Sequence, residues 1–131
     1  FIDRLMRGEP PFIHGDGEQT RDFVDVSDIV EANMLALGIA SVPSDPINIG
    51  TGTATSIKDL ASLLIDIMGR KHLKPVFDQP RTGDIRHSCA DIHRAKILLG
   101  YEPKVPLKEG LIKLLKDCEE TFHSNQKAHS K

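Results

Sequence analysis

The sequence of 131 residues lacks the features of several broad protein classes. It contains no apolar run near the ~18 residues that a membrane-spanning helix needs. Its two cysteines, Cys89 and Cys118, have neither metal spacing nor the density of a disulfide scaffold. The net charge of −2 provides no basic field for nucleic acid or an anionic membrane. These absences predict a soluble cytoplasmic protein with two reduced thiols, in which any anion site is local.

The two ends of the chain carry weak signals. No charged segment followed by an apolar one opens the sequence, as a secretory signal would. Residues 1–7 already have a helical pattern, which stops at Gly8 and Pro10. A start inside a helix predicts that a further part of the protein precedes Phe1. Residues 124–131 are polar and aperiodic, so they are expected to fray.

Short β-rich segments alternate with amphipathic helical segments along the chain. Strands are predicted at residues 11–14, 23–26, 46–49 and 75–77. Helices are predicted at 28–40 after a Ser27 cap, 57–68 after Ser56 with Asp59, from an Asp91 cap to Gly100, and 107–122. The alternation predicts an α/β fold, specifically a mixed α+β arrangement with about four to five helices. The strands are too few for a complete doubly wound sheet.

The first candidate site is the loop from Gly15 to Arg21. Its two glycines permit a tight turn that brings backbone amides close to an anion. The Arg21 guanidinium can bind phosphate oxygens through two parallel hydrogen bonds. The alternative is a surface connection in which Arg21 pairs with Asp22 or Asp25.

The second candidate site is the loop at residues 80–88. Arg81 suits a phosphate, whereas the Asp84 carboxylate suits a pair of sugar hydroxyls that donate hydrogen bonds. A nucleoside diphosphate carries both groups a short distance apart. The alternative is an exposed Arg81–Asp84 ion pair that closes a turn and adds little stability.

Other patterns are weaker. Residues 50–53 resemble a phosphate loop but lack its lysine and the full G-x-G-x-x-G pattern, which favours a simple turn before a helix. The six histidines show no i, i+4 pair of the metal-binding type. The single tyrosine, Tyr101, is not followed by lysine four residues later and precedes Pro103, so we expect it to pack rather than act as a base.

Taken together, five segments resemble the C-terminal part of extended short-chain dehydrogenase/reductases that act on nucleotide sugars. The order and spacing agree over residues 1–118, nearly the whole chain. The run Arg-x-Gly-Asp-Ile-Arg-His-Ser is most similar to that of UDP-sugar 4-epimerases of the UDP-glucose type. The segments are 11–29, 48–52, 80–88, 99–103 and 107–111.

The resemblance implies an isomerase that uses tightly bound NAD to interconvert UDP-glucose and UDP-galactose, or their N-acetyl forms. It implies that Arg21 and Arg81 clamp the diphosphate and that Asp84 holds the ribose hydroxyls. Phe12 and His14 would lie against the uracil, and Ser88 near the sugar or its loop. Family members often form homodimers through their N-terminal half.

The sequence departs from the family in three respects. His14 stands where Phe or Tyr is usual, and Asp25 stands where Tyr is common. The glycine-rich NAD loop and the Tyr-x-x-x-Lys base are also missing, so residues 1–123 are expected to be a substrate-binding portion that is inactive alone. Two alternatives stay open: a dehydratase or decarboxylase of the same family, and a stand-alone nucleotide-binding module.

Overall fold

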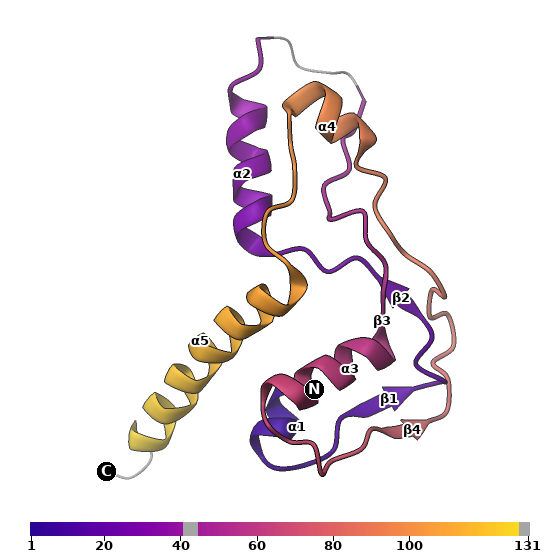
Figure 1. Ribbon diagram of the computed structural model, residues 1–131, viewed down its shortest axis with the longest axis vertical. Helices are drawn as coiled ribbons and strands as arrows, with labels where there is room; N and C mark the ends of the chain where they lie inside the picture. Colours follow the sequence, from indigo (N-terminus) through magenta and orange to yellow (C-terminus); the bar gives the residue numbers. More distant parts are fainter. Residues whose placement is uncertain (41–44, 129–131) are drawn as a thin grey trace.

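The computed structural model describes residues 1–40 and 45–128 and shows the predicted mixture of helices and short strands (Figure 1). Five helices occur in these residues, which confirms the α/β class. The helices are α1 (Ile2–Met6), α2 (Val26–Leu37), α3 (Ile57–Ile67), α4 (His93–Leu99) and α5 (Leu107–Ala128). The strands are β1 (Phe12–His14), β2 (Thr20–Arg21), β3 (Thr55–Ser56) and β4 (Val76–Asp78).

Two small sheets hold the loops together. β1 pairs in parallel with β4, and β2 pairs antiparallel with β3. Side chains alternate along a strand, so Phe12 and His14 share one face of β1 while Ile13 points into the interior, where it is 1% exposed. A bridge between Thr20 and His87 ties the long loop after β4 to β2.

The apolar interior forms two clusters. The first joins α2 and α4 at the top of Figure 1, and the second joins α1, α3 and α5. Tyr101 belongs to the first cluster; its ring is fully buried and its hydroxyl donates a hydrogen bond to the carbonyl of Gly50 at 2.9 Å. The sequence prediction that Tyr101 packs is therefore confirmed.

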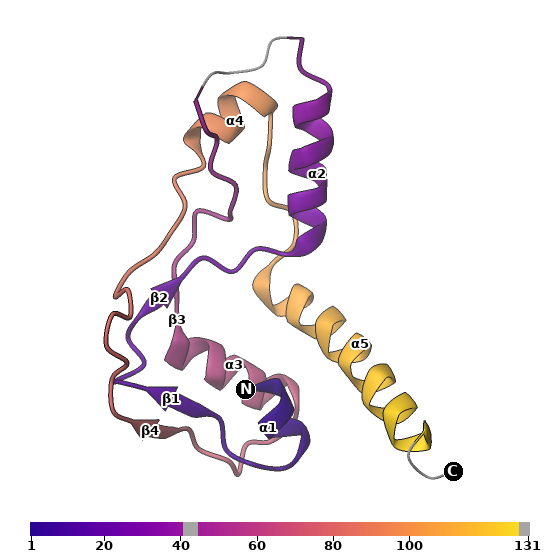
Figure 2. The same ribbon diagram turned by 180° about the vertical axis from the view of Figure 1, so that it is seen from behind.

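Helix α3 follows its sequence pattern closely and begins directly after β3 (Figures 1 and 2). Ser56 is the N-cap, and its hydroxyl oxygen accepts the backbone N–H of Asp59 at 3.0 Å. The buried face contains Ala61, Leu64 and Ile65. The apolar spacing thus predicted both the helix and the side that packs inward.

Replacing Ser56 with alanine should destabilise the chain by about 1 kcal/mol, because an N–H at the start of α3 loses its partner. Denaturant unfolding followed by circular dichroism would measure the loss. Ser62→Ala, at an exposed position inside the same helix, is the matched control and should not destabilise. An equal loss in both variants would contradict the capping role of Ser56.

Helix α2 differs from the prediction at both ends. Its N-cap is Asp25, not Ser27, because the Asp25 carboxylate accepts the backbone N–H of Ser27 at 2.9 Å. A carboxylate also stabilises the positive N-terminal end of a helix. The helix ends at Leu37 rather than Ala40. The departure of Asp25 from the family pattern therefore coincides with a capping role.

Most of the apolar periodicity of α2 lies on its exposed side. The buried side carries Ala32 and the carboxylate of Asp28, which accepts the backbone N–H groups of Lys104 at 3.0 Å and Val105 at 3.2 Å. The exposed apolar side chains recur about once per turn. They are Val26, Val30, Met34 and Leu37, between 55% and 80% exposed, and are called the α2 apolar face below.

Two predicted strands and a second predicted cap are also wrong. Of residues 23–26, the first three lead into α2 and Val26 begins it, and residues 46–49 form no ladder. A strand needs a neighbour that pairs its N–H and C=O groups, and neither segment has one in the described part of the chain. At α4 the N-cap is Ile92, although the Asp91 carboxylate still accepts the N–H of His93 at 3.0 Å.

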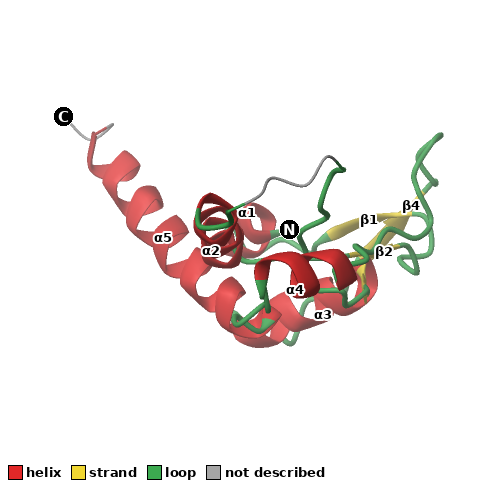
Figure 3. Cartoon of the chain, turned by 90° about the horizontal axis from the view of Figure 1, so that it is seen from above, coloured by secondary structure: helices red, strands yellow, loops and turns green. Residues whose placement is uncertain are grey.

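Helix α5 projects away from the strands (Figure 3). It continues to Ala128 and so enters the segment 124–131 that was expected to fray; residues 129–131 lie outside the described residues. No glycine or proline follows Gly110 to end a helix. Within residues 1–40 and 45–128, every helix is too short or too polar to cross a membrane.

Candidate functional site

A cavity of 450 Å³ brings together five of the six side chains that the sequence singled out. It lies between α1, β1 and the loop after β4. Alternation along β1 directs both Phe12 and His14 toward it, whereas Arg21 comes from β2 and the other two from the loop. The predicted residues on its wall are Phe12, His14, Arg21, Arg81 and Asp84.

Arg21 and Asp84 form an ion pair inside this cavity. Nη2 of Arg21 lies 2.5 Å from Oδ1 of Asp84, and its Nη1 donates to the carbonyl of Ile85 at 2.6 Å. The two side chains are 29% and 33% exposed, so the pair lies at the cavity wall rather than deep in the interior. Arg21 pairs with neither of the partners that its neighbourhood in the sequence offered, since Asp22 and Asp25 bind other groups.

Arg81 meets His14 instead of pairing with Asp84. Its Nη2 lies 2.9 Å from Nε2 of His14. The rings of Phe12 and His14 touch edge to face with centroids 5.7 Å apart, and the Arg4 guanidinium lies 5.7 Å from the centre of the Phe12 ring. The predicted residues thus contribute two guanidinium groups, one carboxylate and two flat rings to a wall that Arg4 and Phe1 also line.

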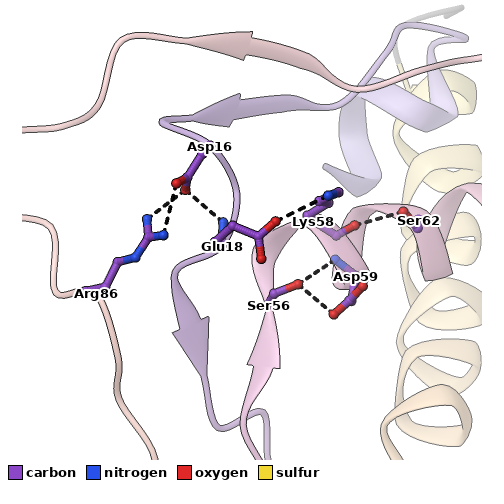
Figure 4. A network of polar contacts seen from close by, with 7 residues as sticks. All are labelled: Asp16, Glu18, Ser56, Lys58, Asp59, Ser62 and Arg86. Carbon is purple, nitrogen blue, oxygen red and sulfur yellow. Dashed lines mark hydrogen bonds and ion pairs between the residues drawn. The ribbon is translucent and has the colours of Figure 1, made fainter.

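The loop at residues 15–18 is tied to the loop after β4 by a two-point ion pair (Figure 4). Arg86 donates to the two carboxylate oxygens of Asp16 at 2.7 and 2.9 Å. Hydrogen bonding from Arg86, with a further bond from the N–H of Glu18, lowers the pKa of Asp16 to about 2. The Lys58 ammonium in turn donates to Glu18 at 3.2 Å, which links the loop to α3.

We expect the Asp16 carboxyl to titrate near pH 2, because Arg86 stabilises its ionised form. A lowered pKa means that this pair contributes stability above the ordinary carboxyl range and loses it as the pH falls through about 2. Carboxyl ¹³C shifts measured against pH would show the midpoint. In Arg86→Gln the midpoint should return toward 3.8; an unchanged midpoint would contradict the assignment.

Glycine is required where this loop approaches α3. Gly17 has φ of 77°, and a Cβ there would lie 3.0 Å from the Cβ of Lys58. The backbone N–H of Lys58 donates to the carbonyl of Gly17 at 3.0 Å, so the two backbones are in direct contact. The loop at residues 15–18 is thereby held against the start of α3, which fixes the position of this loop beside the cavity.

The loop at residues 50–53 does bind an anionic group, but it is the carboxylate of Asp22. The backbone N–H groups of Thr51, Gly52 and Ala90 donate to it at 2.9 to 3.2 Å. Burial raises the pKa of Asp22, but these hydrogen bonds outweigh burial and leave it lowered. A side chain at Gly50 would collide with the carboxylate at 2.6 Å. These amides are therefore engaged within the protein.

The structure also places Ser88, which the sequence predicted near the site, and Gln19, which it did not. Ser88 lies outside the cavity wall, and its backbone N–H donates to the carbonyl of Thr20 at 3.1 Å, which anchors the loop. Gln19 was missed; it is buried, lines the cavity and donates to the carbonyl of His14 at 2.8 Å. A glutamine in a polar loop gives no sequence signal of burial.

The sequence of the chain is similar to that of a known protein family. The family described as GDP-mannose 4,6 dehydratase matches residues 1–114. A putative UDP-glucose 4-epimerase of Methanocaldococcus jannaschii is 39% identical over 111 residues, which are 85% of this chain and 35% of that protein. The chain therefore spans about a third of the length of this relative.

Solved structures agree. The UDP-glucose 4-epimerase of Thermotoga maritima with UDP-glucose superposes with a TM-score of 0.84 at 43% identity, over 92% of this chain and 38% of that one. The UDP-glucuronic acid 4-epimerase of Bacillus cereus with UDP-glucuronic acid and NAD gives 0.80 at 34% identity, over 89% and 38%.

The fold and these matches define the class as Rossmann-type nucleotide-sugar epimerases and dehydratases. The chain belongs to the NAD-dependent epimerase/dehydratase family. Among the described residues no group of three His, Cys, Asp or Glu side chains could hold a metal ion.

Proposed function

We propose that this chain is the substrate-binding part of an NAD-dependent UDP-sugar 4-epimerase of the UDP-glucose/UDP-galactose type. The observation that carries the proposal is the convergence of Phe12, His14, Arg21, Arg81 and Asp84 on one cavity from three separate segments. Similar proteins with UDP-glucose or UDP-glucuronic acid bound support it.

Each wall group has a complementary part of a UDP-sugar. The guanidinium groups of Arg21 and Arg81 bind the diphosphate, whose four non-bridging oxygens accept charge-assisted hydrogen bonds. The Asp84 carboxylate accepts from the ribose hydroxyls, and Phe12 with His14 contacts the uracil ring. Ser88 acts through the loop, near the sugar. On binding, the diphosphate competes with Asp84 for Arg21 and frees the carboxylate for the ribose.

The chemistry itself belongs to a part of the protein outside this chain. NAD held by that part would supply reversible hydride transfer at C4 of the sugar. The chain's own residues bind the remote nucleotide end and thereby orient the sugar, which lowers the entropic part of the barrier. Alone, these 131 residues should be inactive.

The α2 apolar face supports the proposal that the chain is part of a larger protein. Four apolar side chains exposed by 55% to 80% on one helix are costly in water and form a contiguous strip. We propose that an N-terminal Rossmann domain, which holds NAD, covers this strip. We also propose that the intact enzyme is a cytoplasmic homodimer and that residues 1–123 are its substrate-binding portion.

The mass of the native protein tests the domain proposal. A mass larger than 14.5 kDa by a domain or more would support it. A mass near 14.5 kDa would instead favour a stand-alone nucleotide-binding module. Calorimetric titration of the native protein with UDP tests the clamp, and absence of binding would overturn it.

A second reaction of the same family, dehydration or decarboxylation, is the alternative, and the match to a dehydratase family favours it. Both reactions use the same nucleotide contacts and differ in the chemistry at the sugar. Incubation of the native protein with UDP-glucose and, separately, with UDP-glucuronic acid, followed by chromatography and mass measurement of the products, separates these reactions. Epimerisation conserves the mass of the sugar, dehydration removes one water, and decarboxylation of UDP-glucuronic acid removes carbon dioxide.

A further inference from the structure

The contact between His14 and Arg81 determines the protonation of the imidazole. A guanidinium can only donate hydrogen bonds, so Nε2 of His14, 2.9 Å from Nη2 of Arg81, must accept and carries no proton. The single proton of the neutral ring is then on Nδ1, which faces Oδ2 of Asp78 at 3.9 Å. His14 thus lies between a cation and an anion that favour opposite protonation states.

The remaining charged groups around His14 are engaged in pairs of opposite sign. His14 is 31% exposed and lines two adjoining cavities, of 450 and 440 Å³. The ion pairs at or beside these walls are Asp16 with Arg86, Arg21 with Asp84, and Arg4 with Glu9. Because each pair is neutral overall, Arg81 and Asp78 are the charges that decide how His14 acts.

We propose that His14 is a pH-dependent positioning residue for Arg81, so that the protein binds a UDP-sugar more tightly when His14 is protonated. This inference rests on the proposed function of the cavity. The neutral ring holds Arg81 by accepting its hydrogen bond. The protonated ring cannot accept, turns its charge toward Asp78 and releases Arg81 to the diphosphate.

Two effects of protonating His14 both raise the affinity for a UDP-sugar. The released Arg81 has all its donors available for phosphate oxygens, and the imidazolium adds a positive charge beside a ligand with two negative charges. A ligand that binds the protonated state better takes up protons on binding, so its affinity rises as the pH falls.

Calorimetry with UDP-glucose on the native protein tests the proposal, because the diphosphate of a UDP-sugar has no proton to gain between pH 8 and pH 5.5. Affinity should rise about three- to tenfold from pH 8 to pH 5.5. Titrations in buffers of different ionisation enthalpy should detect proton uptake. His14→Phe should lose both effects, and the exposed control His72→Phe should keep them. The same pH dependence in His14→Phe would overturn the proposal.

A measurement without ligand separates this inference from the proposed function. At pH 8, ¹⁵N spectra of the His14 ring should show the proton on Nδ1, and Arg81→Ala should weaken that preference. A proton on Nε2 in the native protein would overturn the positioning role. Absence of UDP-glucose binding at every pH together with a proton on Nδ1 would overturn the proposed function and leave the contact established.

Discussion

Arg21→Ala should weaken UDP binding by about 1.5–3 kcal/mol, which is roughly 10- to 150-fold in the dissociation constant. The substitution removes a charge-assisted contact with the diphosphate. It also leaves the Asp84 carboxylate, 2.5 Å from Arg21 in the free protein, without this partner and close to the negatively charged diphosphate. Calorimetric titration with UDP at constant pH and salt would measure the loss.

Arg81→Ala should lower UDP affinity by a similar factor, since its guanidinium faces the same cavity. Arg94→Ala is the matched control, because Arg94 on α4 pairs with Asp45 and lies outside the cavity wall. It removes the same charge and should leave affinity within about twofold. Unchanged affinity in both Arg21→Ala and Arg81→Ala would show that the clamp is wrongly assigned.

Asp22→Ala should destabilise the folded chain by about 2–4 kcal/mol. The carboxylate accepts the backbone N–H groups of Thr51, Gly52 and Ala90 and the hydroxyl of Thr51, so four donors lose their partner together. It therefore connects three segments that are distant in sequence. Thermal or denaturant unfolding would measure the loss.

The matched control is Asp66→Ala, which removes an exposed carboxylate paired with Lys71 and should leave the unfolding midpoint nearly unchanged. The two variants should also differ in acid. Because the folded-state pKa of Asp22 is lowered, its contribution is present above the ordinary carboxyl range and is lost as the pH falls through the folded pKa. Asp22→Ala should therefore unfold with a weaker dependence on acid, and equal midpoints for both variants would refute the anchoring role.

Local patterns predicted those elements whose stabilising contacts lie near in sequence. Helix α3 needed only the Ser56–Asp59 cap and a single apolar face, all within its own length. Strand alternation likewise put Phe12 and His14 on one side of β1. The same logic was wrong for residues 46–49, since a strand depends on a neighbour that the segment itself does not contain.

The partners of the site residues could not be predicted from local patterns. Sequence spacing allowed Arg81 to pair with Asp84, three residues away, and Arg21 with Asp22 or Asp25. In the structure Arg21 pairs with Asp84 across 63 residues, and Arg81 with His14 across 67. An exposed neighbour gains little from pairing, so the folded loops decide which charges meet.

The sequence by itself determined the α/β class, the main helices and the residue types of the proposed diphosphate and ribose site. Hydrophobic periodicity, helix capping and side-chain chemistry are local properties of the chain. Tertiary structure alone decided that five of those residues share one cavity and that Asp22 occupies the amides of the glycine loop. It also decided that the apolar face of α2 points outward. Such outcomes depend on which distant segments pack together, and packing depends on the whole fold rather than on any single stretch of chain.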